Sequence, residues 1–439
     1  MGAFFFRICV VLTALAGSSG LWAASIKSSL SSDYDYLEGL YKHLHQHPEL
    51  SYKEKETSAR VAAELQEIGF TVTERVGGYG VVAILVNGSG PTLMLRTDTD
   101  ALPVQEQTGL AYASQVRTVD GEGQDVGIMH ACGHDMHMTV LVGAARQMVQ
   151  RKQDWQGTLM LIAQPAEERG GGAKAMLADG LFERFPRPDF NFAFHVSAGL
   201  PVGQIGFASG YVMANVDSVD IKVHGVGGHG AYPHMTKDPV VLAARIITSL
   251  QTIVSRELSP LEPAVITVGS IHGGTKHNII GNSVDLQLTV RSYSDQTRDF
   301  LLRRIREISI GEAQVAAIPQ ALWPSVRVKD EYTPSTYNQP DYTARIVQHW
   351  RSIFAREQLV EVSPVMGGED FSRYGRVEPK IPSALFWLGT VDPQQVKTAA
   401  AKGIALPSLH SAKYAPLPEP SIMMGVEAMT EAALMLLAR

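Results

Sequence analysis

The stretch TLMLRTDTD (residues 92–100) joins a short apolar run to a cluster of charged side chains. Two later stretches repeat this arrangement: TLMLIAQPAEE (158–168) ends in paired glutamates, and DFNFAFH (189–195) ends in a histidine. Apolar runs of this length that alternate with helical segments are typical of a mostly parallel sheet with helices on both faces. Because α/β sheets bind ligands beyond the carboxyl ends of their strands, the three endings predict one functional site.

The order of the remaining segments predicts two domains. Helical periodicity indicates helices at 33–47 and 53–69 before the first strands. A second unit begins near residue 211, with strands and helices expected at 217–225, 239–257, 263–271, 283–292 and 295–312. The chain then returns to helix and strand segments and ends in a helix expected at 419–438. We therefore expect a discontinuous α/β catalytic domain, 25–210 and 325–439, with an α+β domain inserted at 211–324.

Composition and charge narrow the class of protein. Of the 439 residues, 45% are hydrophobic and 19% are charged, which allows sizeable cores and argues against disorder. The formal net charge of −6 gives no general attraction to nucleic acid or to anionic lipid. We therefore expect a globular protein that binds neither nucleic acid nor a membrane surface.

The first 24 residues have the order of a secretory signal peptide. Arg7 precedes the apolar run ICVVLTALAG (8–17), and small residues follow it. This run is shorter than the roughly 20 apolar residues that a membrane-spanning helix needs. We expect residues 1–24 to be removed and the protein to be exported, periplasmic or secreted, without a membrane anchor. Of the two cysteines, only Cys132 then remains in the mature chain.

The stretch HACGHDMH (130–137) surrounds that cysteine with three histidines and an aspartate. Thiolate, imidazole and carboxylate groups are the ligands of zinc and similar ions. The sequence offers a set of them around the three strand endings and near the C-terminus: Cys132, His134, Glu167, Glu168, His195 and His410. Each taken alone has an ordinary structural explanation, such as a hydrogen-bonded histidine or a solvated helix start. Together they favour a metal centre.

The adjacent glutamates indicate hydrolysis by metal-activated water. One carboxylate can bind the metal while the other moves a proton from water to a leaving amine. Other chemistries fit less well, because the chain has no G-x-S-x-G nucleophile motif. The glycines of ERGGGAK (168–174) lack P-loop spacing and are interpreted as a turn into a helix.

Several motifs in order resemble a known family. They are HQHPELSYKEKET (45–57), LRTDTDALP (95–103), GIMHACGHDMHM (127–138), QPAEERGGGAKAM (164–176), GHGAYPH (228–234), GGEDF (367–371) and LHS (409–411). In them the chain resembles the aminoacylase/carboxypeptidase family of two-metal peptidases. The likeness is greatest to its amidohydrolase branch, which includes hippurate hydrolases, N-acyl-amino-acid amidohydrolases and plant auxin-conjugate hydrolases.

The resemblance implies a role for each candidate residue. It makes Glu167 the general acid and base, and it gives Asp98 the task of orienting a metal ligand. Arg96 stands where the wider family has a ligand histidine. The cofactors implied are two divalent ions, zinc or manganese, with cobalt possible. Their implied ligands are Cys132, His134, Glu168, His195 and His410.

The resemblance also assigns the inserted domain. In the family this domain mediates dimerisation and closes over the substrate, so a homodimer is implied. His229 would polarise the scissile carbonyl, commonly in the partner subunit, and Asn278 and Arg291 would bind the substrate. A guanidinium suits a carboxylate because it binds both oxygens at once, although Arg291 could instead form a surface ion pair.

The function implied is hydrolysis of the amide bond of N-acyl amino acids, hippurate-like or related conjugates. The alternative on the same scaffold is a metallocarboxypeptidase or dipeptidase acting on short peptides. A binding protein without catalysis is a third hypothesis, but it leaves the paired glutamates without a purpose.

Overall fold

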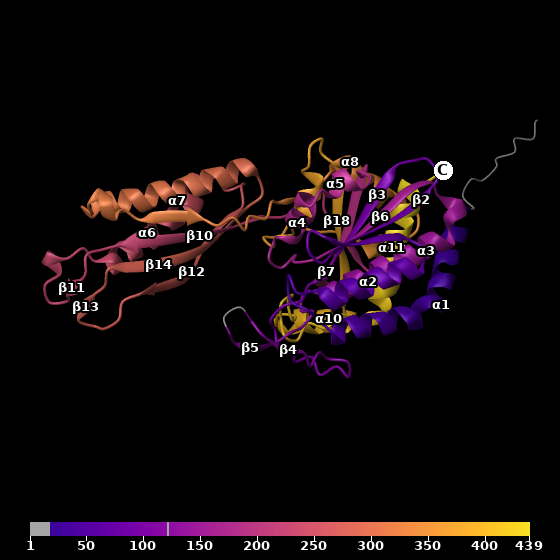
Figure 1. Ribbon diagram of the computed structural model, residues 1–439, viewed down its shortest axis with the longest axis horizontal. Helices are drawn as coiled ribbons and strands as arrows, with labels where there is room; N and C mark the ends of the chain where they lie inside the picture. The colour runs from indigo at the N-terminus through magenta and orange to yellow at the C-terminus, as the bar shows by residue number, and fades with distance from the viewer. Residues whose placement is uncertain (1–17, 121–122) are drawn as a thin grey trace, which may run out of the picture.

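The computed structural model describes residues 18–120 and 123–439. Most of the expected signal peptide, residues 1–17, lies outside the described residues. Figure 1 shows two bodies, a larger one that holds both ends of the described chain and a smaller, elongated one. The larger body is built on one sheet and the smaller one on another.

The larger sheet has eight strands in the order β1-β2-β6-β3-β7-β18-β8-β17. Their bounds are β1 Thr71–Val76, β2 Gly80–Asn87, β3 Thr92–Asp98, β6 Gly157–Gln164, β7 Phe190–Pro201, β8 Ile205–Phe207, β17 Leu359–Glu361 and β18 Ser383–Val391. The central strands β6, β3, β7 and β18 run parallel, whereas β1 and β2 form an antiparallel edge. Strands β3, β6 and β18 are buried along almost their whole length, as near-continuous apolar runs require. The predicted mostly parallel sheet is confirmed.

Helices cover both faces of this sheet, as predicted (Figure 1). On one face lie α1 Ser18–Gln46, α2 Lys55–Glu67, α3 His134–Gln150, α8 Pro340–Trp350 and α11 Pro418–Leu436. On the other lie α4 Gly172–Ala178, α5 Leu181–Arg184 and α9 Ser372–Gly375. The helix expected to begin at residue 33 begins at Ser18. The buried face of this helix includes Ile26, Leu30 and Leu37, which are spaced as on one side of a helix. This apolar periodicity already indicates that the helix begins before residue 33.

The smaller body contains a four-stranded sheet in the order β12-β14-β10-β15. Its elements are β10 Asn215–His224, α6 Pro239–Thr252, a π-helical turn Ile253–Glu257, β12 Ala264–Gly273, β14 Ser283–Ser292, α7 Asp295–Val315 and β15 Ser325–Val328. Burial alternates along β10 and β14, because α6 and α7 pack on one face of the sheet. The strand β15 pairs with β10, so this unit continues to Val328 and not to the expected 324. The four residues of β15 are too few to give a periodic signal.

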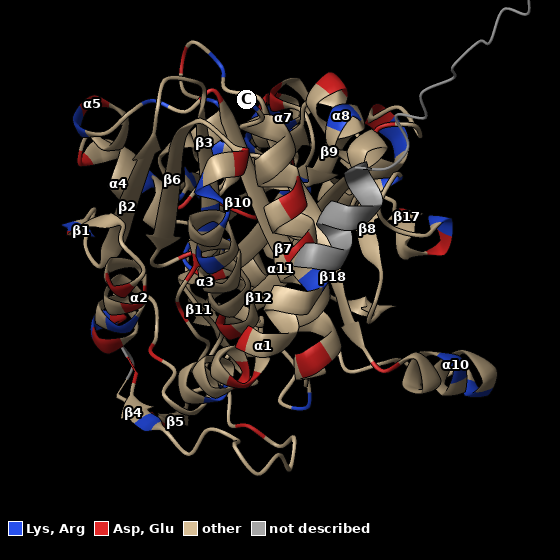
Figure 2. Ribbon diagram, turned by 90° about the vertical axis from the view of Figure 1, so that its right-hand side faces the viewer, with Lys and Arg blue, Asp and Glu red and all other residues tan. Residues whose placement is uncertain are grey.

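Three two-stranded ladders, one further α-helix and four short 3₁₀ helices complete the described chain; the 3₁₀ helices are Lys152–Asp154, Pro233–Met235, Gln320–Leu322 and Arg356–Gln358. The ladders pair β4 Arg117–Val119 with β5 Asp125–Gly127, β9 Gly210–Met213 with β16 Thr336–Asn338, and β11 Gly228–His229 with β13 Ile279–Ile280. The helix α10, Pro393–Lys402, projects from the body in Figure 2, where acidic and basic residues are interspersed along the helices. Across the described ranges, no helix combines the length and apolar character needed to cross a membrane.

Candidate metal centre and active site

Most of the predicted site residues gather where the central strands end. β3 ends at Asp98, and β6 leads into the turn that carries Glu167 and Glu168. Gly133 lets the chain turn from Cys132 into α3, because its φ of 75° is left-handed. A Cβ there would lie 2.7 Å from a methyl group of Val196 in β7. The glycine of the cysteine-glycine-histidine motif therefore packs α3 directly against the sheet.

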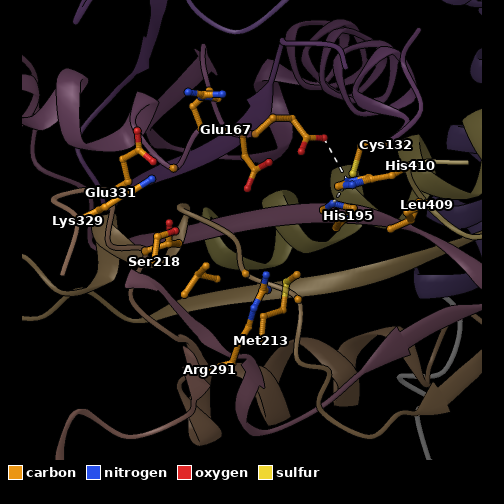
Figure 3. A pocket seen from close by; sticks show the side chains of 17 residues that line it. Cys132, Glu167, His195, Met213, Ser218, Arg291, Lys329, Glu331, Leu409 and His410 are labelled. Atoms are coloured by element: carbon orange, nitrogen blue, oxygen red, sulfur yellow. Dashed lines mark hydrogen bonds and ion pairs between the residues drawn. The ribbon is translucent and has the colours of Figure 1, made fainter. Parts of the chain in front are cut away.

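All five predicted metal ligands lie close together. Figure 3 labels three of them, Cys132, His195 and His410. Cys132 Sγ is 3.6 Å from His195 Nε2. Glu168 Oε1 is 3.4 Å from His410 Nε2 and 3.9 Å from His134 Nε2. Ligand atoms of Cys132, His134 and His195 form one compact group, and those of Cys132, Glu168 and His410 form a second. The two groups share the Cys132 thiol.

The unpaired atoms of this cluster fit a cation. The Nε2 nitrogen of the buried His134 has no hydrogen-bond partner, and neither does Glu168 Oε1. Buried polar atoms are rarely left in this way unless an ion or water satisfies them. Burial raises the pKa of the Cys132 thiol well above its usual value, and a bound divalent ion would reverse this shift by stabilising the thiolate. Burial also lowers the pKa of His195 to about 4, so its ring is neutral and can bind metal at neutral pH.

Asp98 lies behind the ligands, as predicted for a residue that orients one of them. Its Oδ2 is 3.7 Å from His134 Nε2, and its Oδ1 is 2.7 Å from His137 Nδ1. The other nitrogen of His137 accepts a hydrogen bond from the amide of Val196 (2.8 Å). With both ring nitrogens engaged, His137 braces the site and is not itself placed as a ligand.

Arg96 occupies the position where the wider family has a ligand histidine, and it forms buried ion pairs there. Its guanidinium donates to Asp98 Oδ2 (2.6 Å) and to both oxygens of Glu369 (2.8 and 3.2 Å). Asp370 Oδ1 lies 3.3 Å from the same group. Sequence reasoning included these two acids in the GGEDF motif but gave them no role. A buried arginine in a strand needs nearby carboxylates, and this requirement is the signal that could have identified them.

Glu167 lies next to the metal ligands, since oxygen or nitrogen atoms of His134, Glu167 and Glu168 are within 4.8 Å of one another, but it differs from them in its acidic surroundings. Oxygen atoms of Glu167, Glu369 and Asp370 lie within 4.8 Å of one another. Burial and the charge of Glu369 raise the pKa of Glu167 well above its usual value. A carboxyl with a raised pKa beside a metal centre is suited to accept and return a proton.

A pocket of about 640 Å³ opens beside these groups and is lined by both bodies of the protein. Figure 3 shows Cys132, His195 and His410 on one side of the pocket, Glu167 next to them, and Lys329 and Glu331 on the opposite side. Arg291 enters from β14 and donates to the carbonyl of Met366 (2.9 Å). Among the described residues it forms no ion pair, so the structure places it as a pocket cation and not in a surface salt bridge.

The other two predicted residues, His229 and Asn278, lie outside this pocket. They belong to the β11–β13 tip of the smaller body, the part farthest from the catalytic sheet in Figure 1. The amide of Gly230 donates to the carbonyl of Asn278 (2.8 Å), which joins the two motifs at this tip. The sequence motifs gave no information on distance. The long strand β10 leads to His229, and the long strands β12 and β14 flank Asn278, so both residues lie away from the pocket of their own chain. Within one chain the structure therefore does not bring Asn278 into the pocket that Arg291 lines, and the expectation that both bind the substrate stays a prediction.

Comparisons with known proteins agree with this geometry. The family model described as peptidase family M20/M25/M40 matches residues 94–410. The chain is 37% identical over 393 residues to thermostable carboxypeptidase 1 of Saccharolobus solfataricus, covering 89% of this chain and 92% of that protein. It is also 37% identical to the N-acetyldiaminopimelate deacetylase of Bacillus subtilis, covering 80% of this chain and 89% of the deacetylase.

A solved structure shows the same architecture. The crystal structure of the YXEP protein of Bacillus subtilis, described as a dinuclear metal binding peptidase, aligns with a TM-score of 0.74 and 28% sequence identity. The alignment covers 93% of this chain and 99% of that one. The family match spans most of the catalytic body and all of the inserted unit, and the ligand cluster lies inside it. The chain therefore belongs to peptidase family M20/M25/M40 and is a metal-dependent hydrolase.

Proposed function

We propose that this protein is an exported amidohydrolase with two divalent metal ions, which releases the amino acid from N-acyl amino acids. The observation that carries the proposal is the pair of ligand groups sharing Cys132, with Glu167 beside them in one pocket. The relative in Bacillus subtilis named as a deacetylase supports the substrate class. Zinc or manganese suits the mixed thiolate, imidazole and carboxylate ligands, and cobalt is a third option.

The residues divide the reaction between them. Bound metal ions would supply Lewis-acid chemistry, lowering the pKa of water and polarising the scissile carbonyl. Glu167 would take a proton from the attacking water and deliver it to the nitrogen of the leaving amino acid. Arg291 would hold the free carboxylate of the substrate, because its charge in the pocket has no acidic partner among the described side chains.

A carboxypeptidase or dipeptidase is the second candidate function. It is favoured by the relative in Saccharolobus solfataricus that is named as a carboxypeptidase. Both reactions cleave an amide bond next to a free carboxylate, so the same Arg291 and Glu167 serve either one. The group on the acyl side of the bond distinguishes them.

Amine release by the signal-free protein tests the proposal. Hippurate, N-acetyl and aromatic N-acyl amino acids and dipeptides would be compared after chelation and after addition of zinc, manganese or cobalt. We expect no release from chelated protein, recovery with added metal, and faster turnover of acyl amino acids than of dipeptides. A preference for dipeptides would favour the peptidase, and release that survives chelation would contradict the metal mechanism.

We further propose that a homodimer completes the active site. His229 is exposed at the far tip of the inserted unit, where it cannot reach the pocket of its own chain without a large rearrangement. In a two-fold dimer the partner subunit's His229 would meet the scissile carbonyl and stabilise the negative charge that develops on its oxygen. The neighbouring Asn278 would enter the same site.

Mixing two inactive variants tests this arrangement. Glu167→Gln and His229→Ala would be expressed separately, then dissociated and reassembled together. Each mixed dimer has one site with an intact Glu167 and an intact partner His229, so random exchange should restore about a quarter of wild-type activity. Glu167→Gln mixed with itself is the control. No recovery in the mixture, despite exchange of subunits, would place His229 in its own chain's site, whereas full activity of His229→Ala alone would place it outside catalysis.

A further inference from the structure

The turn that carries Glu167 and Glu168 is held through its backbone by two buried carboxylates. The amide of Ala166 donates to Glu54 Oε1 (2.7 Å). The amides of Glu167 and Glu168 donate to the two oxygens of Asp100, at 3.1 and 3.0 Å. Three successive N–H groups thus point at two acids that stand far from the turn in the sequence.

The backbone of this turn needs such support. Ala166 has a φ of 49°, in the left-handed region that disfavours residues with a Cβ. The carbonyl of Ala166 accepts hydrogen bonds from the amides of Gly171 and Gly172 (3.2 and 3.1 Å), which closes the chain tightly on itself. A Cβ at Gly172 would lie 1.5 Å from the carbonyl oxygen of Pro165. Successive N–H groups in a turn of this kind form a concave anion site, which the two carboxylates fill.

Asp100 also contacts a metal ligand. Its Oδ1 lies 3.4 Å from His134 Nδ1, and its Oδ2 accepts a hydrogen bond from Ser51 (2.6 Å). Metal-binding histidines commonly turn their second nitrogen to a carboxylate, which fixes the orientation of the ring. His134 Nε2 then faces Asp98 Oδ2 and Glu168 Oε1, at 3.7 and 3.9 Å. One side chain therefore fixes the ring of one ligand and the backbone of another.

The burial of Asp100 and Glu54 lowers the stability of the folded protein. Asp100 is 1% exposed and Glu54 is fully buried. No lysine or arginine of residues 18–120 and 123–439 forms an ion pair with either of them, and Glu54 Oε2 has no hydrogen-bond partner. Carboxylates buried without a lysine or arginine partner lower the stability of the folded protein, so the geometry that they maintain at the turn, and not a gain in stability, explains why they are there.

We propose that Asp100 and Glu54 are positioning residues that set Glu167 and Glu168 relative to His134. The proposal rests on the proposed function of Glu167 as the proton carrier and Glu168 as a ligand. Asp100 fixes both glutamates and the His134 ring, whereas Glu54 fixes the left-handed residue that precedes them. An error of about 1 Å in placing a catalytic group can cost about 100-fold in rate, which sets the size of the expected effect.

Asp100→Asn is the principal test. Asparagine keeps one acceptor oxygen, but its NH₂ group would face the second amide and could not accept from it. We expect kcat to fall about 100-fold, with KM changed less than about threefold and metal content unchanged. The visible spectrum of the cobalt-loaded protein should also shift, because the His134 ring and Glu168 are no longer fixed.

Paired variants of Glu54 separate hydrogen bonding from packing. Glu54→Gln retains an acceptor for the Ala166 amide and should stay within about threefold of wild type, whereas Glu54→Ala should lose at least about tenfold in kcat. Glu49→Gln is the matched control, since Glu49 accepts a hydrogen bond from the Thr57 amide (2.8 Å) in the same segment and does not contact the turn. Its kcat and its cobalt spectrum should match those of wild type.

Distinct results would overturn the proposal. Wild-type kcat in Asp100→Asn would refute it, and so would activity that returns fully with excess metal. If circular dichroism shows that Asp100→Asn is unfolded, the comparison of Glu54→Gln with Glu54→Ala decides. Equal kcat values for these two variants would refute the role of Glu54. If Glu167→Gln is inactive while Asp100→Asn is normal, only this proposal fails. If Glu167→Gln is fully active, the proposed function itself fails.

Discussion

Glu167→Gln should lower kcat by about 10⁴-fold while the metal content of the purified protein stays at the wild-type level. The amide of glutamine preserves the shape of the side chain but can neither accept the proton of the attacking water nor return it to the leaving amine. Glu167 is flanked by Glu369 and Asp370 and belongs to the pocket that also holds the ligand groups. Loss of the carboxylate therefore removes proton transfer without removing a ligand.

The measurements are steady-state amine release and elemental analysis of the metal. Glu331→Gln is the matched control, because it removes a carboxylate from the opposite side of the same pocket. It should change kcat by less than about tenfold. Metal lost together with activity in Glu167→Gln would make Glu167 a ligand, and retained activity would exclude it as the general base.

Cys132→Ala is expected to lower activity by at least about 10³-fold and to reduce the bound metal. The thiol belongs to both ligand groups, with His195 Nε2 at 3.6 Å, so its removal weakens both halves of the centre at once. The small side chain of alanine leaves the tight turn before α3 undisturbed. The protein should therefore stay folded while losing its metal.

Cys132→Asp distinguishes loss of a ligand from loss of a reactive thiol. A carboxylate binds the same divalent ions, so an aspartate can take the place of the thiolate as a ligand. We expect part of the metal and part of the activity to return in this variant, while Cys132→Ser behaves like Cys132→Ala. Metal content that is unchanged in Cys132→Ala would show that the thiol is not a ligand.

The sequence by itself determined the layered α/β architecture and most of the residues that gather around the pocket. The strand endings at RTDTD and QPAEE are local patterns, in which a buried apolar run stops at polar side chains. Parallel strands align their carboxyl ends, so residues at these ends meet whatever the rest of the chain does. The interpretation of ERGGGAK as a turn into a helix was also correct, because α4 begins at Gly172. This pattern is local as well.

Only the tertiary structure decided which distant groups act together. Arg96 pairs with Glu369 across 273 positions of sequence, and the Ala166 turn is held by Glu54 across 112. The extra strand β15, the entry of Arg291 into the pocket and the remote place of His229 are equally nonlocal. Periodicity and spacing describe neighbours along the chain, whereas these contacts depend on how two sheets and their connections are arranged in space. A buried charge without a local partner shows that a distant partner exists, and the folded chain is needed to identify it.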